Sequence, residues 1–121
     1  MPLTSGFFDP KERERHFISH GSDFGALDAA EYEQIADAFL GEPKPPHVAE
    51  CVRKQGDVLR FNPATDTFGV LDANGLIRTF FKPVPCSTVV PESKRLALRE
   101  AGRCHRHPNN LLYFKSVCAR W

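Results

Sequence analysis

The sequence predicts an α+β fold in which helices come first and an antiparallel sheet follows. Apolar residues recur at helical spacing up to about residue 41, three prolines then interrupt residues 42–46, and the apolar period changes to two. A chain of 121 residues buries one modest core. We therefore expect one domain over residues 1–121, with a helical part at about 10–41, an antiparallel sheet at about 48–83 and an irregular, basic segment at 84–121.

The first expected helix begins at Pro10 and ends near His20. Proline suits the first turn of a helix, where its missing amide donor would have no partner in any case. The charged residues that follow Pro10 are spaced for i,i+4 pairs. His16 and His20 are four residues apart, so the helix places both on one face.

The second expected helix covers about residues 29–40. Asp28 and Glu31 have the spacing of a capping box, and Gly41 is typical of the position that follows a helix. The apolar residues between them recur every three or four positions, which indicates one buried face.

Three expected strands, 57–61, 67–71 and 76–81, are separated by turn residues and predict an antiparallel meander. Asn74-Gly75 predicts a type I′ hairpin, because both central residues of that turn need positive φ. Residues 48–54 are expected to add an edge strand. The residues expected in the core are Tyr32, Ile35, Phe39, Val58, Phe61, Val70 and Ile77.

Four cysteines, Cys51, Cys86, Cys104 and Cys118, are widely spaced, and we expect them to be free thiols. The segment 104–107 contains zinc-ligand residue types, but the close pair of cysteines that is usual in structural zinc sites is absent. We therefore expect no metal and no cofactor. A zinc-stabilised interaction domain remains an alternative.

The apolar runs last only a few residues, far short of the ~20 that a membrane-spanning helix needs. We expect no membrane-spanning segment. The first ten residues also lack the basic and apolar regions of a secretory signal peptide.

Charge is distributed unevenly along the chain. Residues 1–50 carry four Lys/Arg and ten Asp/Glu, whereas residues 51–121 carry twelve Lys/Arg and five Asp/Glu. The carboxyl-terminal half is therefore cationic and would attract a polyanion such as RNA. A chance segregation of solvated charges explains the same asymmetry.

Several ordered motifs over about residues 13–83 resemble one family of toxins. A His-x-x-Asp-Phe-Gly sequence begins at His20, a Gly-x-x-x-x-Phe-Asn-Pro-x-Thr hairpin begins at Gly56, and Asn74-Gly75 precedes a strand that carries Thr79. Together they resemble colicin D and the related carboxyl-terminal toxin domains of contact-dependent inhibition and Rhs-type effectors.

The resemblance implies a fold of the barnase, EndoU, colicin and RelE type, with amino-terminal helices packed on a twisted antiparallel sheet. It implies a metal-independent endoribonuclease that cleaves tRNA in the anticodon region, with 2′-hydroxyl attack leaving a 2′,3′-cyclic phosphate. It also implies a monomeric toxin, a cognate immunity protein as partner, and action in the bacterial cytoplasm after delivery from another cell within a larger secreted effector. A catalytically inactive RNA- or protein-binding module of the same fold is the alternative.

The resemblance also implies site residues. His20 stands where the colicin D pattern has its catalytic histidine, Thr79 where it has a serine, Phe81 where it has a tryptophan, and Lys82 where it also has lysine. Phe81 is then expected to stack on an extruded base. Its alternative is a core phenylalanine.

Further candidates complete this set. His16 is a second candidate proton carrier, and Arg13 and Arg15 are expected to replace the lysines that colicin D has where this chain has Phe17 and Ser19. Arg60 and Arg78 are candidates for phosphate binding, or face water.

Alternation along the last strand decides between some of these candidates. Thr79 and Phe81 share one face, whereas Arg78 and Lys82 share the other, so both pairs line one cleft only where a bulge or the strand end intervenes. Residues 107–114 resemble the closing His-Gly-x-x-Thr-Asn-x-x-Tyr-Phe segment of related toxins, which makes residues 84–106 an atypical insertion.

Overall fold

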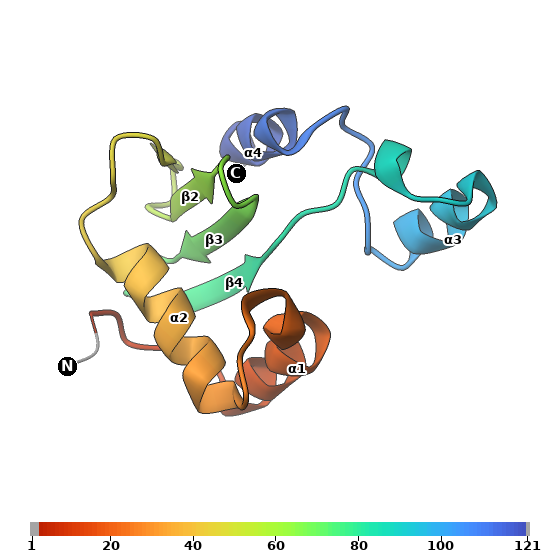
Figure 1. Cartoon of the computed structure of the whole chain (residues 1–121). Helices are drawn as coiled ribbons and strands as arrows, with labels where there is room; N and C mark the ends of the chain where they lie inside the picture. Colours follow the sequence, from red (N-terminus) through yellow and green to blue (C-terminus); the bar gives the residue numbers. More distant parts are fainter. Residues whose placement is uncertain (1–2, 121) are drawn as a thin grey trace.

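The computed structural model describes residues 3–120 and confirms the α+β class. Four antiparallel strands form one sheet in the order β1-β2-β3-β4, with two helices before it in the chain and two after it (Figure 1). None of the helices in residues 3–120 is long and apolar enough to cross a membrane. The helices are α1 (Pro10–His20), α2 (Ala29–Gly41), α3 (Arg95–Glu100) and α4 (Asn110–Cys118), and the strands are β1 (Ala49–Val52), β2 (Val58–Asn62), β3 (Thr67–Leu71) and β4 (Ile77–Phe81).

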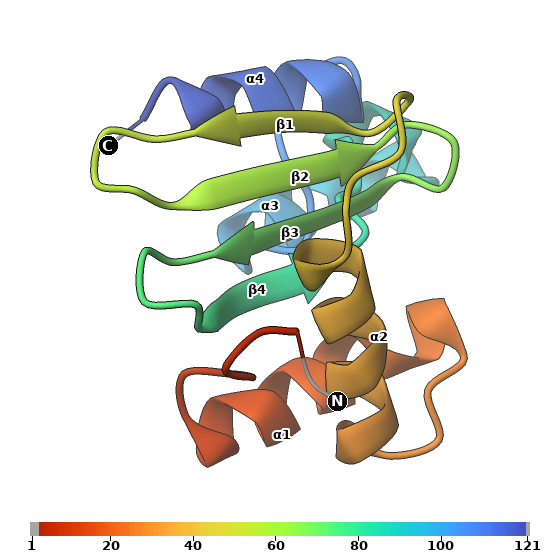
Figure 2. The ribbon, with the colours of Figure 1, turned by 90° about the vertical axis from the view of Figure 1, so that its left-hand side faces the viewer.

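Helices α1 and α2 pack against β3 and β4, whereas α4 lies next to β1 and β2 (Figure 2). The predicted N-cap of α2 forms, because Asp28 accepts from the Glu31 amide, and Asp9 caps α1 by accepting from the Lys11 amide. The first core, between α1, α2 and the sheet, contains Phe7, Tyr32, Ala36, Leu40, Ile77 and Phe80.

The second core lies on the side of the sheet that α4 covers, and it contains Leu59, Phe61, Phe68, Val70 and Phe114. Of the residues predicted to lie in the core, Tyr32, Phe61, Val70 and Ile77 are buried, and Ile35, Phe39 and Val58 are partly buried. The disulfide Cys51–Cys118 joins β1 to the end of α4. The expectation of free thiols is therefore wrong, because the fold brings together cysteines 67 positions apart.

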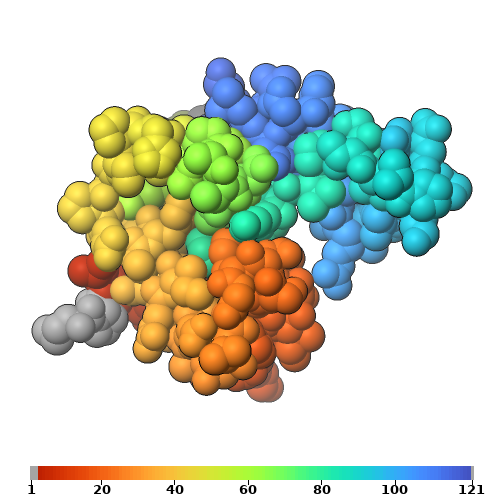
Figure 3. Space-filling model, in the orientation of Figure 1, coloured from red at the N-terminus to blue at the C-terminus, as the bar shows by residue number. Residues whose placement is uncertain are grey.

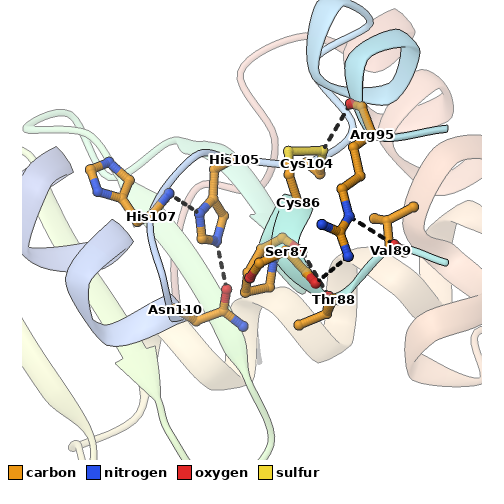
Figure 4. Close-up of a disulfide and its surroundings, with 10 residues drawn as sticks. Cys86, Ser87, Thr88, Val89, Arg95, Cys104, His105, His107 and Asn110 are labelled. Carbon is orange, nitrogen blue, oxygen red and sulfur yellow. Dashed lines mark hydrogen bonds between the residues drawn. A yellow bond between two sulfur atoms is a disulfide. The ribbon is translucent and has the colours of Figure 1, made fainter. Parts of the chain in front are cut away.

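Residues 84–106 form a lobe that stands out beyond the end of β4 (Figure 1). A second disulfide, Cys86–Cys104, closes the neck of this lobe, next to a parallel bridge between Pro85 and His105. Inside the lobe the Arg95 guanidinium donates to the carbonyls of Val89 (3.0 Å) and Ser87 (2.8 Å) (Figure 4). The segment expected to be irregular thus contains two helices and a cross-linked lobe.

The turn between β3 and β4 differs from the type I′ prediction. Positive φ occurs at Gly75 (80°) but not at Asn74. Asp72 explains the difference, because its side chain accepts from the amides of Asn74 and Leu76 and stabilises a longer turn.

Candidate active site

The main candidate site is a pocket of about 450 Å³ between the end of α1, the end of β4 and the lobe. Figure 3 shows the hollow between the orange amino-terminal part and the cyan and blue lobe. We call it the central pocket. Its polar and aromatic lining includes His20, Thr79, Phe81, Lys82, Arg103 and His105.

Strand β4 explains why Thr79 and Lys82 line the same pocket. The register shifts next to Val70, where Thr79 pairs with Val70 and Ile77 pairs with Leu71, which leaves Arg78 as the extra residue of a bulge. Lys82 follows the last residue of the strand, so strict alternation of side chains no longer holds for it. The strand end thus brings together two side chains that alternation alone would separate.

His20 is the last residue of α1 and presents its imidazole to the central pocket. The ring lies against Phe81, with centroids 5.3 Å apart, and within residues 3–120 neither ring nitrogen has a hydrogen-bond partner. Burial lowers the pKa of His20, the positive charges of His16 and Arg103 lower it further, and Asp23 opposes them. A neutral imidazole with free nitrogens is suited to accept a proton.

Thr79 and Phe81 form the floor of the central pocket. In the part of the chain that the structure describes, the Thr79 hydroxyl makes no hydrogen bond, so it is available to a ligand. Phe81 is half-buried and meets Phe68 and Tyr113 edge to face, with centroids 5.6 Å and 6.5 Å away. Phe81 therefore belongs to both the second core and the pocket wall.

Lys82, next to the end of β4, and Arg103, in the lobe, both supply positive charge to the central pocket. The Lys82 ammonium lies 5.5 Å from the centroid of the Phe24 ring. Neither cation forms an ion pair with a carboxylate among residues 3–120, although Asp23 also lines the pocket. Two cations beside a neutral imidazole provide a setting for a phosphate group.

His105 and Tyr113 are site residues that the sequence analysis missed. Their rings are stacked at 4.4 Å and 17°. The Nε2 atom of His105 lies 2.7 Å from Oδ1 of Asn110, and its Nδ1 accepts from the amide of His107 (Figure 4). An acceptor role at Nδ1 leaves the proton on Nε2, so the ring is neutral and both nitrogens are occupied.

Asn110 holds this arrangement in place and is itself buried. Its amide nitrogen donates to the carbonyl of Pro83 at 2.9 Å and to the carboxylate of Asp66 at 3.1 Å. One side chain thus joins the end of β4, the β2–β3 turn and the ring of His105. Burial also lowers the pKa of His105, which the bond to Asn110 partly opposes.

A spacing signal for these residues is present in the sequence. In the closing pattern the histidine stands eight positions before the tyrosine, and counting back from Tyr113 gives His105. The expected match to the closing pattern begins at His107, whereas this count places its histidine at His105. Nothing in the sequence indicates Arg103, because only the closed lobe brings it to the pocket.

His16 and Arg15 line a neighbouring pocket of about 390 Å³, which shares His20 and Arg103 with the central pocket. The rings of His16 and His20 lie 6.0 Å apart, as their spacing on one helix face predicts. Burial lowers the pKa of His16, and its Nδ1 is buried with no partner. Arg15 pairs with Glu12. These two residues flank the central pocket and do not line it.

Arg60 lies outside the pockets described above. It pairs with Glu50 at 2.6 Å and donates to the carbonyls of Phe39 (3.0 Å) and Glu42 (2.6 Å). The guanidinium therefore ties the end of α2 to the sheet, which is a structural role.

Arg13 and Arg78 also lie elsewhere. Arg13 is 3.9 Å from a carboxylate oxygen of Glu33. Arg78 covers the ring of Phe8, 3.8 Å from its centroid, and is 3.8 Å from Asp72. Neither of these two arginines lines the central pocket.

The zinc alternative loses its cysteine ligands, because all four cysteines form disulfides. Within residues 3–120 no group of three or more His, Cys, Asp or Glu side chains is placed to hold a metal ion. No protein-family model matches the chain, and no curated protein is detectably similar to it in sequence. The arrangement of the central pocket therefore carries the functional argument.

Proposed function

We propose that the chain is an endoribonuclease toxin domain that cleaves tRNA in the anticodon region without a metal ion. The observation that supports this proposal is the meeting of His20 and Thr79 in one pocket with Lys82 and Arg103. These residues come from segments far apart in the sequence, and the first three match positions of the colicin D pattern. A proton acceptor, a hydroxyl and two cations are what RNA transesterification needs.

In the first half of the reaction, His20 removes the proton from a ribose 2′-hydroxyl. The 2′-oxygen attacks the adjacent phosphorus and forms the new P–O bond. Lys82, Arg103 and the Thr79 hydroxyl stabilise the negative charge that grows on the phosphoryl oxygens. The lowered pKa keeps His20 in the neutral, accepting form at neutral pH.

In the second half, the bond from phosphorus to the 5′-oxygen breaks and that oxygen takes a proton. The Nε2 proton of His105 is committed to Asn110, and burial raises the pKa of Tyr113, which weakens it as an acid. Arginine does not give up its proton. We therefore assign the donor role to the ammonium group of Lys82, and the products are a 2′,3′-cyclic phosphate and a 5′-hydroxyl.

The choice of tRNA and of the anticodon region follows from the resemblance. Single-stranded loops offer unstacked bases, and the exposed parts of Phe81 and Tyr113 offer aromatic surface to them. The same resemblance supports action in the bacterial cytoplasm after delivery from another cell, and an immunity protein that covers the cationic pocket. Disulfides form in oxidising compartments, which agrees with a route outside the cytoplasm.

The experiment that tests the proposal is incubation of the purified, oxidised chain with total tRNA in excess EDTA. We expect discrete fragments that end in 2′,3′-cyclic phosphate. His20→Ala is expected to slow cleavage by about 10²–10⁴-fold, and His47→Ala, at an exposed histidine between α2 and β1, serves as the matched control. Cleavage that stops on addition of EDTA, or that survives in His20→Ala, contradicts the proposal.

One observation favours the alternative of an inactive binding module. The ring nitrogens of His105 are both occupied and His16 lies in the neighbouring pocket, so among residues 3–120 no second histidine offers a free ring nitrogen to the central pocket. Tight RNA binding by the wild-type chain with no cleavage of any tRNA would establish this alternative.

A further inference from the structure

A second cationic pocket lies on the other side of the His105–Tyr113 stack. Its volume is about 590 Å³, and three arginines line it: Arg99, Arg106 and Arg120. Arg99 comes from α3, Arg106 from the segment between α3 and α4, and Arg120 from the residues after α4. We call it the arginine pocket.

The positive charge of the arginine pocket is not compensated. None of its lining residues is acidic, and within residues 3–120 none of the three arginines forms an ion pair. In the same range the Arg120 guanidinium donates only to the Ser116 hydroxyl, at 3.5 Å. By contrast, Arg53 and Arg60 each pair with a carboxylate. Three guanidinium groups that converge without an anion form a site that attracts one.

The arginine pocket adjoins the central pocket. His105 and Tyr113 line both, so the stacked rings form the boundary between them. A polymer with a negative charge on every unit would fill the two hollows at once. Such a strand would cross the aromatic stack, a surface on which bases stack whatever their sequence.

We propose that the arginine pocket binds a backbone phosphate of single-stranded RNA, next to the nucleotide held in the central pocket. This proposal rests on the proposed ribonuclease function of the central pocket. It assigns a role to the lobe, because Arg99 and Arg106 both belong to residues 84–106. The lobe would then extend the RNA-binding surface beyond the reacting nucleotide.

The test measures RNA binding as a function of salt concentration. The probe is a fluorescein-labelled decanucleotide of RNA with 2′-O-methyl groups, which lacks the attacking hydroxyl and is not cleaved. The test variant is Arg99→Gln/Arg106→Gln/Arg120→Gln. Each phosphate contact contributes about 0.7 to the magnitude of the slope of log K against log salt, so this variant, which loses one such contact, should show a slope that is smaller by about 0.7.

The matched control removes the same charge elsewhere on the surface, as Lys11→Gln/Lys44→Gln/Arg78→Gln. We expect this control to keep nearly the wild-type slope. Near-ultraviolet circular dichroism verifies that both triple variants are folded. A wild-type slope in the arginine variant, or an equal loss in both variants, overturns the proposal, as does competition by polyglutamate that equals competition by unlabelled RNA.

Substrate length gives a second readout. Lengthening a substrate from a dinucleotide to a decanucleotide should lower KM of the wild-type chain, and lower it much less for the arginine variant. The outcomes separate the two proposals. If the chain cleaves RNA and the three arginines have no effect, the ribonuclease proposal stands and the RNA-binding role of the arginine pocket is refuted. If RNA binding depends on the arginines and no RNA is cleaved, only the ribonuclease proposal is refuted.

Discussion

The imidazole of His20 lies against the ring of Phe81, with centroids 5.3 Å apart and planes inclined by 33°. This contact joins the last residue of α1 to the last residue of β4. Phe81 is itself fixed by the second core through Phe68. The position of the proposed base is therefore set by packing, since its nitrogens are free of protein hydrogen bonds within residues 3–120.

Phe81→Leu is expected to lower kcat by about tenfold or more, because the smaller side chain lets the imidazole shift. The control is Phe61→Leu in the same core, away from the pocket. Both variants should lose about 1 kcal/mol of stability. Equal kcat values in the two variants, measured on tRNA with unfolding curves alongside, would show that Phe81 has no positioning role.

The pH profile of cleavage should follow the ionisation of His20. Its pKa lies below 6.5, so activity should rise through a midpoint below that value and level off near neutral pH. Arg103 lowers this pKa, so Arg103→Gln should move the midpoint to higher pH. Arg99→Gln, a neighbour in the lobe, should leave the midpoint in place. A midpoint in Arg103→Gln at or below the wild-type one would contradict the assignment.

Stability should also depend on pH, with a definite sign. Burial lowers the pKa of His16, His20 and His105 below 6.5, so the unfolded chain binds these protons at a higher pH than the folded chain does. The stability that these three histidines contribute is then fully present above about pH 6.5 and is lost as the pH falls through their lowered pKa values. Thermal unfolding midpoints across this range test the point. In His16→Gln/His105→Gln the decline should be smaller.

Asn110→Ala should cost about 2–3 kcal/mol, because it leaves the buried carbonyl of Pro83 and the ring of His105 without their partner. Asn109→Ala on the same helix removes only the N-cap bond to Leu112 and should cost about 1 kcal/mol. Denaturant unfolding compares the two. A similar loss of unfolding free energy in both variants would mean that the hydrogen bonds of Asn110 contribute little to stability.

The two disulfides should have separable effects. Removing Cys51–Cys118, which closes the longer loop, should cost about 4 kcal/mol of stability and spare the activity of the folded fraction. Removing Cys86–Cys104 should cost about 3 kcal/mol at most and lower cleavage strongly, because the lobe carries Arg103 and His105. Serine pairs, assayed for unfolding and for tRNA cleavage, test this. Full activity without Cys86–Cys104 would remove the lobe from the site.

Local patterns predicted the helices and the sheet, because caps, prolines and the change of period act over a few residues. The strand 67–71 and the helix begun by Asp28 are confirmed. Local patterns gave a wrong prediction for the turn between β3 and β4, where a single side chain changes the turn type. The Asp72 side chain accepts hydrogen bonds from two backbone amides and stabilises a longer turn in place of the type I′ turn that Asn74-Gly75 predicted.

The far wall of the pocket was not predictable in the same way. Arg103 and His105 reach it only because Cys86 and Cys104 close the lobe, and four scattered cysteines do not reveal how they pair. Arg60 was misleading for the opposite reason. As a cation on a strand it was a candidate to bind a phosphate or to face water, but its guanidinium donates to carbonyls at the end of α2.

The disulfide neck makes residues 87–103 separable from the rest of the chain in evolution. Both ends of this stretch leave the body at one covalent junction, so changes of its length need not disturb the strands beneath. Apart from Arg103, which lines the central pocket, this stretch is free to diverge while Thr79 and Phe81 stay in register. Under the proposed ribonuclease function, homologues that share the sheet and differ in residues 87–103 would differ in which nucleic acids they accept, rather than in the bond they break.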